Sequence, residues 1–432
     1  MTKSREHIEK IKDKIVKDAM QLDCVQTRKG LIPLKTYKNI LIYLDTNENT
    51  HSLYQYNNFS SRVEITRQPP WKTIGMFPKS MEDCDVLELK TFLIKEYNVE
   101  FPSKVLNEGI DAYSRLKAYN PVLNYLKSLE WDKNNRVINL LSHYFSAEDN
   151  EYTRYLSKMT MNAACARVDK PGVKYDYMLI LEGRQGIGKS FGLEILGAPW
   201  HRNVSLTDRT KDTVDKMQGA WIIEVAEMAA FKKKDIESIK SFITNSNDAE
   251  RLSYGRRTQQ FPRQSIFVGT INPDNHGYLS DATGNRRFLP VECQDYIKFK
   301  DLRRDRDQLW AEAWQIYKDG FPMYIGIGSR EEQMAIDEQR NREIMDDWQE
   351  LIEAYIGDND KVRGVDIWTE CLKGFSSDFD GFKQRRVAQC MRKLGWIKKN
   401  IRKEGKVFSG YYNPNYPTDA TPDPWKSNGK EN

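Results

Sequence analysis

The feature that most constrains this chain is a glycine-rich segment, LEGRQGIGKS, which follows the order G-x-x-x-x-G-K-S. The strand-like run YMLILE precedes the glycines and the helix-like run FGLEIL follows them, which is the context that a phosphate-binding loop requires. In such a loop the backbone N–H groups and the helix N-terminus face the phosphates, the lysine meets the β- and γ-phosphate oxygens, and the hydroxyl holds Mg²⁺. We therefore predict that ATP and Mg²⁺ bind here. The predicted contacts are Gly183, Arg184, Gln185, Gly186, Ile187, Gly188, Lys189, Ser190 and Phe191.

Length and pattern together predict several domains. A chain of 432 residues exceeds what one hydrophobic core usually serves. Between about residues 177 and 325, short apolar runs such as YMLIL, WIIEV and SIFVG alternate with helical segments, a rhythm typical of a parallel sheet covered by helices. We expect a small α+β leader over 1–117, an α/β ATPase over 118–330, a helical linker with a basic module over 331–412, and a loose tail over 413–432.

Composition excludes several classes of protein. No stretch approaches the roughly 18 to 20 apolar residues of a membrane span, and the start of the chain lacks the apolar region of a signal peptide. The six cysteines are scattered without a CxxC pair, so neither a disulfide framework nor a zinc site is expected. We expect a cytoplasmic protein that has no membrane partner.

Two further apolar runs end in polar residues suited to ATP hydrolysis. WIIEVAEM carries Glu224 and Glu227, where a phosphate-loop enzyme needs carboxylates for the metal and the attacking water. Glu224 is the first candidate for either role, and Glu227 is the second, although Glu227 could merely solvate the start of a helix. SIFVGT is followed by Asn272, whose amide could orient the water or could simply cap a turn.

The segment TGNRRFLPV places Arg286 and Arg287 just before another apolar run. An arginine that reaches across a subunit boundary can stabilise charge on the transferring phosphoryl group. The sequence does not distinguish between these two arginines, and an arginine pair by itself is more often a surface pair.

At this point the motifs resemble a known family. LEGRQGIGKS, WIIEVAE, LSYGRR, FPRQSIFVGTIN, DATGNRRFLPV and the earlier segment NPVLNYLKSLEWDKNNRV look like the virulence-associated protein E family of phage and pathogenicity-island ATPases. The resemblance is strong over about residues 118–325 and weak in the leader. It implies kinship with superfamily 3 and AAA+ helicases, which work on DNA as rings, and therefore a homo-oligomer, expected to be a hexamer. By this likeness Lys189, Ser190, Glu224, Asn272 and one of the two arginines form the ATPase site.

Two regions are candidates for holding DNA. Between the acidic strand and the Asn272 strand, Tyr254, Arg256 and Arg257 could lie on a pore hairpin, as they would in superfamily 3 motors, or on a solvated basic loop. Lys240, on the preceding helix, could approach the nucleotide, a neighbouring subunit or DNA, or could be an ordinary exposed lysine.

The second region is the basic module, where ten Lys or Arg stand against one acidic residue from Lys383 to Lys406. Its pattern of two helices and a hairpin resembles a winged helix, a fold that binds DNA but also docks proteins. The candidate contacts are Lys383, Arg385, Arg386, Lys398, Lys399 and Arg402.

These features lead to one main hypothesis and two alternatives. The main hypothesis is an ATP-dependent helicase or translocase that replicates a phage or mobile element, with single-stranded, forked or origin DNA and other replication proteins as partners. An initiator or helicase loader that uses ATP as a switch would need the same motifs. A nucleotide kinase shares the phosphate loop, but it needs no basic module.

Overall fold

The structure is a computed structural model, and it describes the larger part of the chain. The described residues are 22–28, 30–72, 75–204, 211–226, 233–250, 259–272, 278–279, 285–343, 346–357, 359–403 and 406–414. They divide into two compact units, Met1–Asn341 and Arg342–Asn432. We describe each unit by itself.

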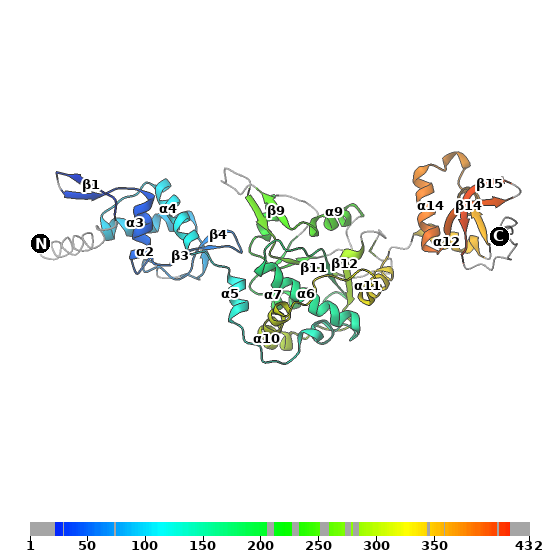
Figure 1. Cartoon of the computed structure of the whole chain (residues 1–432), viewed down its shortest axis with the longest axis horizontal. Coiled ribbons are helices and arrows are strands. Elements are labelled where there is room, and N and C mark those ends of the chain that lie inside the picture. Colours follow the sequence, from blue (N-terminus) through cyan, green and yellow to red (C-terminus); the bar gives the residue numbers. More distant parts are fainter. Residues whose placement is uncertain are drawn as a thin grey trace, which may run out of the picture. The chain divides into compact units, whose positions relative to one another are not determined.

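A five-stranded parallel sheet forms the centre of the first unit (Figure 1). Its strands lie in the order β12-β6-β11-β8-β7, and every neighbouring pair is parallel. The bounds are Met178–Glu182 for β6, His201–Asn203 for β7, Ile222–Val225 for β8, Ile266–Ile271 for β11 and Phe288–Glu292 for β12. The mixed α/β fold expected for the ATPase is therefore confirmed.

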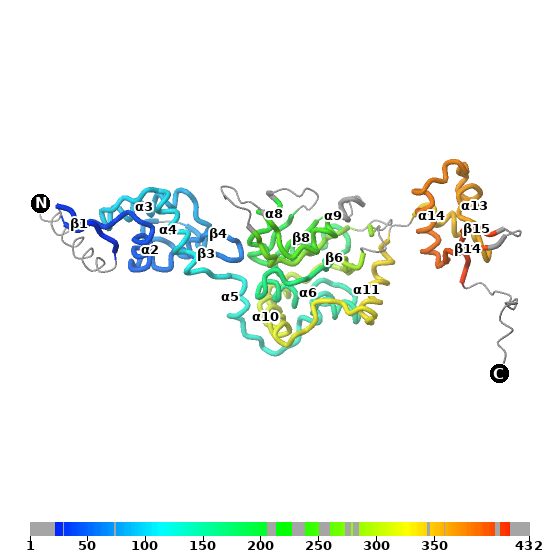
Figure 2. The backbone as a smooth tube through the Cα atoms, turned by 45° about the horizontal axis from the view of Figure 1, so that its top comes forward, coloured from blue at the N-terminus to red at the C-terminus, as the bar shows by residue number. Residues whose placement is uncertain are grey.

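Strands β6, β8 and β11 are buried on both faces, because their apolar residues point to both sides of the sheet. Leu179, Leu181 and Val268 belong to a core with helices α5, α6 and α10, whereas Ile180 and Phe267 belong to a core with helix α9. Figures 1 and 2 show α6 and α10 on one side of the sheet and α9 on the other. The sheet is thus sandwiched between two layers of helix. The bounds are Pro121–Ser128 for α5, Glu151–Asp169 for α6, Lys189–Gly197 for α7, Lys211–Met217 for α8, Lys233–Ile243 for α9, Phe299–Lys318 for α10 and Arg330–Arg340 for α11.

Helix α11 packs on the sheet of the first unit. Its Gln339 donates a hydrogen bond from Nε2 to the carbonyl oxygen of Phe288 at 2.9 Å, and Ala335 joins the sheet core. The boundary between the two units accordingly falls after Asn341, eleven residues later than the boundary expected at 330.

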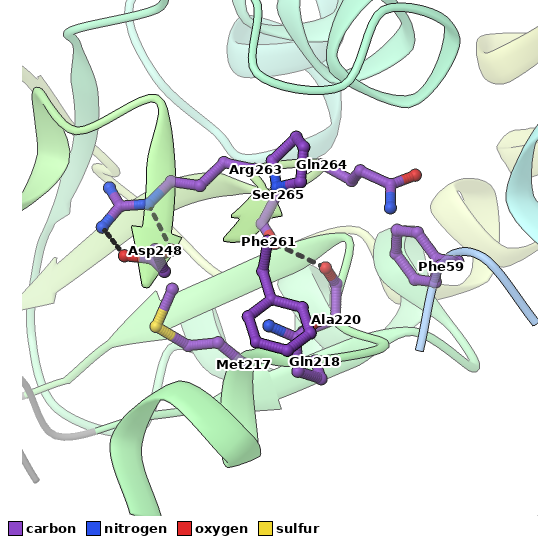
Figure 3. Close-up of a pocket in the computed structure, with 10 residues that line it drawn as sticks. Phe59, Met217, Gln218, Ala220, Asp248, Phe261, Arg263, Gln264 and Ser265 are labelled. Atoms are coloured by element: carbon purple, nitrogen blue, oxygen red, sulfur yellow. Dashed lines mark hydrogen bonds and ion pairs between the residues drawn. The ribbon is translucent and has the colours of Figure 1, made fainter. Parts of the chain in front are cut away.

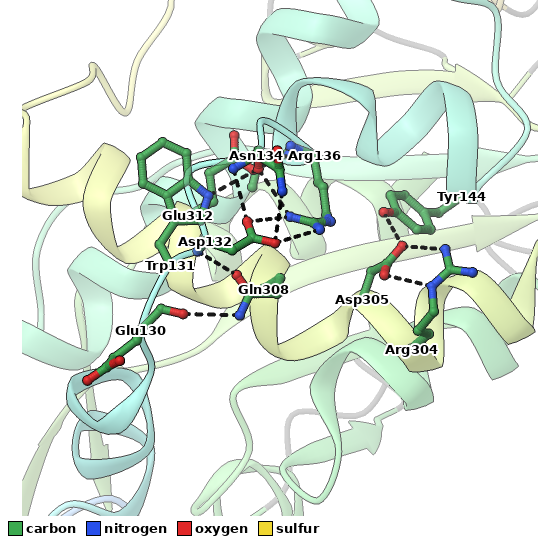
Figure 4. Close-up of polar contacts among 11 residues, drawn as sticks. Glu130, Trp131, Asp132, Asn134, Arg136, Tyr144, Arg304, Asp305, Gln308 and Glu312 are labelled. Carbon is green, nitrogen blue, oxygen red and sulfur yellow. Dashed lines mark hydrogen bonds and ion pairs between the residues drawn. The ribbon is translucent and has the colours of Figure 1, made fainter.

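The segment between α5 and the short helix η1 (Val137–Asn139) is held against helix α10 by polar contacts (Figure 4). Asp132 accepts two hydrogen bonds from the Arg136 guanidinium, each at 2.8 Å. Glu312 of α10, which is buried, accepts the backbone N–H groups of Arg136 and Val137 at 2.5 and 2.8 Å. The Asp132–Arg136 pair thus holds the turn within the segment LEWDKNNRV, and the backbone contacts with Glu312 join the segment to α10. Another helix, η2 (Leu140–Tyr144), follows.

The N-terminal part of the first unit has its own core, which is built by three helices and a small antiparallel sheet. Asp85 is 2% exposed within it and forms ion pairs with Lys72 at 2.5 Å and Lys79 at 2.7 Å. The bounds are Cys24–Thr27 for β1, Gly30–Pro33 for β2, Tyr37–Thr46 for α2, Tyr54–Asn57 for β3, Arg62–Ile65 for β4, Lys79–Ser80 for β5, Asp83–Tyr97 for α3 and Ser103–Leu116 for α4.

The second unit combines short helices with a three-stranded antiparallel sheet in the order β13-β15-β14. Its core contains Val387, Met391 and Trp396, and Leu394 packs against it. The bounds are Asp347–Ile356 for α12, Lys361–Arg363 for β13, Gly364–Asp366 for α13, Ile367–Cys371 for η5, Ser376–Asp378 for η6, Gly381–Lys393 for α14, Ile397–Lys403 for β14 and Lys406–Tyr412 for β15. Most of the expected tail over 413–432 lies outside the described residues.

None of the helices in the described part of the chain combines the length and the apolarity that a membrane span requires.

Candidate functional site

The glycine-rich segment forms a loop between strand β6 and helix α7, which begins at Lys189. The backbone φ is positive at Gly183, Gly186 and Gly188, with values of 148°, 85° and 96°. Residues with a side chain rarely adopt such angles. A Cβ on Gly188 would also lie 2.1 Å from Cζ of Phe299, so both the turn and the packing require glycine there.

The remaining loop residues divide into an exposed set and a buried anchor. Arg184 and Gln185 are exposed. Ile187 is 2% exposed, and its carbonyl oxygen accepts the backbone N–H of Ile297 at 3.1 Å, which ties the loop to the segment after β12. Phe191 is 42% exposed on the first turn of α7, with its ring 4.8 Å from the ring of Phe299. The loop is thus exposed at Arg184 and Gln185 and anchored to the rest of the unit at Ile187.

The Lys189 side chain lies inside this loop. Its Nζ donates hydrogen bonds to the carbonyl oxygens of Gly183 at 2.7 Å and Arg184 at 3.1 Å, and to Oδ1 of Asn272 at 3.0 Å. Burial lowers the pKa of Lys189 from its ordinary value. All three acceptors are neutral oxygens, so phosphate oxygens could replace them with a gain in Coulomb energy.

The Glu224 carboxylate lies at the end of strand β8 and is fully buried. Its Oε1 accepts the hydroxyl of Ser190 at 2.6 Å and the hydroxyl of Thr270 at 2.8 Å, while His201 Nε2 lies 3.3 Å from Oε2. Burial alone would raise the pKa of Glu224, but the nearby His201 and the hydroxyls of Ser190 and Thr270 outweigh it and leave the pKa below its ordinary value. The group is therefore a buried carboxylate in contact with the phosphate loop.

Strand β11 brings the third polar group to the same place, because it lies between β6 and β8. The carboxyl ends of parallel strands meet at one edge of the sheet, which is where ligands of open α/β sheets bind. Asn272 follows β11 directly and contacts Lys189, and Thr270 contacts Glu224. Lys189, Ser190, Glu224 and Asn272, which the sequence analysis selected separately, thus form one cluster.

Sequence reasoning missed two members of this cluster. Thr270 stands two residues before Asn272 on the same strand, and the period of two could have identified it as a residue on the same face. His201 belongs to the short edge strand β7, and nothing in its local sequence distinguishes it from other histidines. Glu227 lies outside the described residues.

Arg286 and Arg287 lie at the opposite end of the sheet from the loop. They form the short helix η4 (Asn285–Arg287), immediately before β12. Phe288 of β12 pairs with Met178 at the start of β6, so about six residue steps, or about 20 Å, separate the level of Arg287 from the level of Gly183. Arg286 is exposed and Arg287 is half-buried.

Lys240 of helix α9 lies near the same end and is buried, with 5% exposure. Its Nζ is 3.4 Å from Oδ1 of Asn285 and 5.8 Å from the centre of the Phe288 ring. Contact of Lys240 with DNA, which we predicted from the sequence, would require the side chain to leave this position.

Strands β9 (Asn247–Glu250) and β10 (Gln259–Pro262) form an antiparallel hairpin between the acidic strand and β11. Its base is fixed by Arg263, whose guanidinium donates to both oxygens of Asp248 at 2.7 Å (Figure 3). The same guanidinium donates to the carbonyl oxygen of Phe242. The Arg263 and Asp248 side chains are 1% and 8% exposed. These two strands lie in the interval for which the sequence allowed either a hairpin or a solvated basic loop. Tyr254, Arg256 and Arg257, which were predicted to contact DNA from it, lie outside the described residues.

The basic candidate residues of the second unit differ in their contacts and in their exposure to solvent. Arg386 forms a bidentate ion pair with Asp346 and stacks on Trp348 at 3.9 Å. Lys383 donates to the carbonyl oxygen of Asp378 at 2.6 Å. The exposed residues are Arg385 on α14 and Lys398 and Lys399 on β14, and the side chain of Arg402 lies outside the described residues.

Comparison with known proteins places the chain in a family. The model of the virulence-associated protein E-like domain matches residues 126–344, which span β6, the phosphate loop, the acidic strand and β12. The chain belongs to the virulence-associated protein E-like family. In this family the glycine-rich loop implies nucleotide binding. A search of curated proteins found no match.

Two solved structures are similar to this virulence-associated protein E-like chain, and both are of the C-terminal region of NrS-1. The A form of the apo region has a TM-score of 0.42 and 11% sequence identity, and it covers 83% of this chain and 96% of that chain. A second structure of the same region has a TM-score of 0.46 and 10% identity, with the same coverage. Scores this low add nothing to the argument, which depends on the family match and on the geometry of the loop.

Proposed function

We propose that this chain is an ATP-dependent DNA helicase or translocase that acts in the replication of a phage or another mobile element. The proposed assembly is a ring of identical subunits, expected to be a hexamer. The observation that carries the proposal is the cluster in which Lys189 and Ser190 of the loop touch Asn272 and Glu224 of two neighbouring strands. These are the groups that ATP hydrolysis requires.

The residues present fit ATP with Mg²⁺. Ser190 donates its hydroxyl hydrogen to Glu224, so its oxygen lone pairs are available to a cation, and the charged carboxylate behind it supplies the hard oxygen environment that Mg²⁺ prefers. Ser190 would hold the ion directly and Glu224 would hold it through water. The bound ion would supply charge neutralisation at the phosphate oxygens. Lys189 would exchange its loop carbonyls for those oxygens.

The polar groups also suggest how water is handled. Two hydroxyls occupy Oε1 of Glu224, which favours the metal-side role for this residue over water activation. Glu227 is then the candidate for the base, and Asn272 is the candidate for orienting the water. Removal of a proton by a positioned carboxylate typically contributes 10²- to 10⁴-fold to a rate.

The arginine pair supports an assembly of several subunits. Arg287 lies about 20 Å along the sheet from the level of the phosphate loop in its own subunit, and Arg286 precedes it, so both are too far for a direct contact with their own nucleotide. An arginine in this place can act on the nucleotide of a neighbouring subunit, as arginine fingers do in trans. Arg286 is the stronger candidate because it is exposed.

Contact with DNA is proposed from the basic residues of the second unit. Helix α14 is followed by the hairpin β14–β15, an arrangement that supports the winged-helix interpretation. From Gly381 to Lys403 the chain carries nine Lys or Arg and no acidic residue. The exposed Lys398, Lys399 and Arg385 would meet phosphates, and the hairpin of the first unit would grip single strands.

The test is steady-state ATP hydrolysis by the full chain with and without single-stranded DNA. Lys189→Ala serves as the blank, and Lys174→Ala, which removes an exposed lysine of the same unit, serves as the matched control. We expect DNA to raise the rate several-fold in the wild type and the control, and no activity in the blank. Hydrolysis that ignores DNA would instead favour the ATP-switch initiator or loader.

A further inference from the structure

His201 faces the buried carboxylate from the side opposite the phosphate loop. Its Nε2 lies 3.3 Å from Oε2 of Glu224, and the two side chains are only 13% and 1% exposed. Within the described part of the chain, neither of these two atoms has a well-formed hydrogen bond to any other group. Two buried polar atoms that face each other at this distance, with no other partner there, are a pair that a small shift would join.

The other oxygen of Glu224 explains why Oε2 needs a partner of its own. Oε1 is already occupied by the hydroxyls of Ser190 and Thr270 at 2.6 and 2.8 Å. Those two bonds fix the position of Oε1, but the carboxylate can still rotate about that point. A donor at Oε2 would remove this freedom, because a carboxylate held at both oxygens has one orientation.

The backbone around His201 is built to bring it to this place. Strand β7 pairs with β8 in parallel register, with His201 opposite Ile222 and Asn203 opposite Glu224. Gly197 ends helix α7 beneath this strand, and a Cβ on it would lie 3.1 Å from Cβ of His201. The close approach of helix and strand thus depends on a glycine and directs the imidazole towards the sheet edge that carries Glu224.

We infer that His201 is a positioning residue that holds Glu224 in the orientation from which it and Ser190 bind the Mg²⁺ of the nucleotide. The inference rests on the proposed function, because it concerns the metal-side role of Glu224. Groups that orient metal ligands from behind typically contribute 10- to 100-fold to metal affinity or activity. His201 would therefore act on the part of nucleotide affinity that depends on Mg²⁺ and leave the rest unchanged.

The experiment compares the affinity of the full chain for a fluorescent ATP analogue in excess Mg²⁺ and in EDTA. The variants are His201→Ala, His201→Gln, which retains a side-chain donor, and His51→Ala, which removes an exposed histidine 3.5 Å from Asp45 in the N-terminal part. We expect the gain in affinity due to Mg²⁺ to fall about tenfold in His201→Ala. The gain should be largely restored in His201→Gln and unchanged in His51→Ala, and the affinity in EDTA should be equal in all of them.

Two results would overturn the inference. The first is a gain due to Mg²⁺ in His201→Ala that equals that of the wild type. The second is an equal loss of affinity in Mg²⁺ and in EDTA, which would mean that His201 only supports the fold. Failure of the proposed function looks different, because the wild type itself would then show no gain due to Mg²⁺, or Lys189→Ala would bind as tightly as the wild type.

Discussion

Replacing Gly188 by alanine tests whether the phosphate loop depends on both its backbone conformation and its packing. The φ angle of Gly188 is +96°, and a Cβ there would lie 2.1 Å from Cζ of Phe299. Gly186 provides a matched control in the same loop, because its φ is +85° but nothing lies within 4 Å of its would-be Cβ. The two variants therefore share the conformational cost and differ in the steric one.

The expected magnitudes follow from these two contributions. A residue with a Cβ in the left-handed region costs about 1–2 kcal/mol. Displacing a packed ring such as that of Phe299, which also contacts Phe191, adds about 1–3 kcal/mol. We expect Gly186→Ala to destabilise the first unit by about 1–2 kcal/mol and Gly188→Ala by about 2–5 kcal/mol. In a Phe299→Ala background the cost of Gly188→Ala should fall towards that of Gly186→Ala, because the ring is gone.

Hydrogen exchange in strand β6 is a suitable assay, because a buried central strand reports the opening free energy of its own unit without interference from the other unit. A loss of 2 kcal/mol would raise the open population about 30-fold. The reasoning would be refuted if Gly188→Ala cost no more than Gly186→Ala, or if removing the Phe299 ring left its cost unchanged.

Three further predictions concern other parts of the chain. Burial raises the pKa of Asp85, but hydrogen bonds from two lysines outweigh it and leave the pKa below its ordinary 3.8. The charged carboxylate therefore adds stability above about pH 4, and this stability is lost as the pH falls through the lowered pKa. Asp85→Asn should make stability depend less on pH on the acid side, which thermal unfolding on either side of pH 4 would measure. Arg263→Met leaves Asp248 charged and buried, and it should lower the free energy of opening of the hairpin strands by about 3–5 kcal/mol, measured by hydrogen exchange. Adding Asp248→Leu should recover most of that loss, because apolar replacement of a buried ion pair is often neutral. If Arg286 acts across a subunit boundary, Arg286→Ala should lower the rate of hydrolysis by about 10³-fold, and mixing it with the inactive Lys189→Ala chain should restore part of the rate; no recovery in any mixture would contradict action in trans.

The local sequence was sufficient to predict the centre of the fold and most of the polar cluster. The glycine pattern predicts a strand, a loop and a helix. Buried strands such as IFVGTI carry apolar residues on both faces, so the parallel sheet and the order of its motifs could be expected. What the pattern does not contain is the order of the strands in space. The position of β11 between β6 and β8 brings Asn272 to Lys189 and Thr270 to Glu224, and this depends on long-range pairing.

The positions of charged residues in the sequence predicted their contacts less well than the apolar pattern predicted the fold. Lys240 and Arg386 were candidates for DNA contact because they are basic, yet one is buried beside Asn285 and the other is paired with Asp346. The partners stand 45 and 40 residues away in the chain, so no local window shows them. For His201 the sequence predicted no role, and its position beside Glu224 becomes visible only in the folded sheet.

The continuity of the hairpin with strand β11 has a mechanical consequence. Only three residues separate the end of β10 at Pro262 from the start of β11 at Ile266, and β11 then runs fully buried for six residues, or about 20 Å, to Ile271. An extended strand that is hydrogen-bonded on both sides hardly stretches, so we expect a pull on the hairpin along the strand to be transmitted to the sheet edge beside the phosphate loop. Thr270 and Asn272 lie at the end of this strand, so a load on the hairpin would act directly on the side chains that contact Glu224 and Lys189.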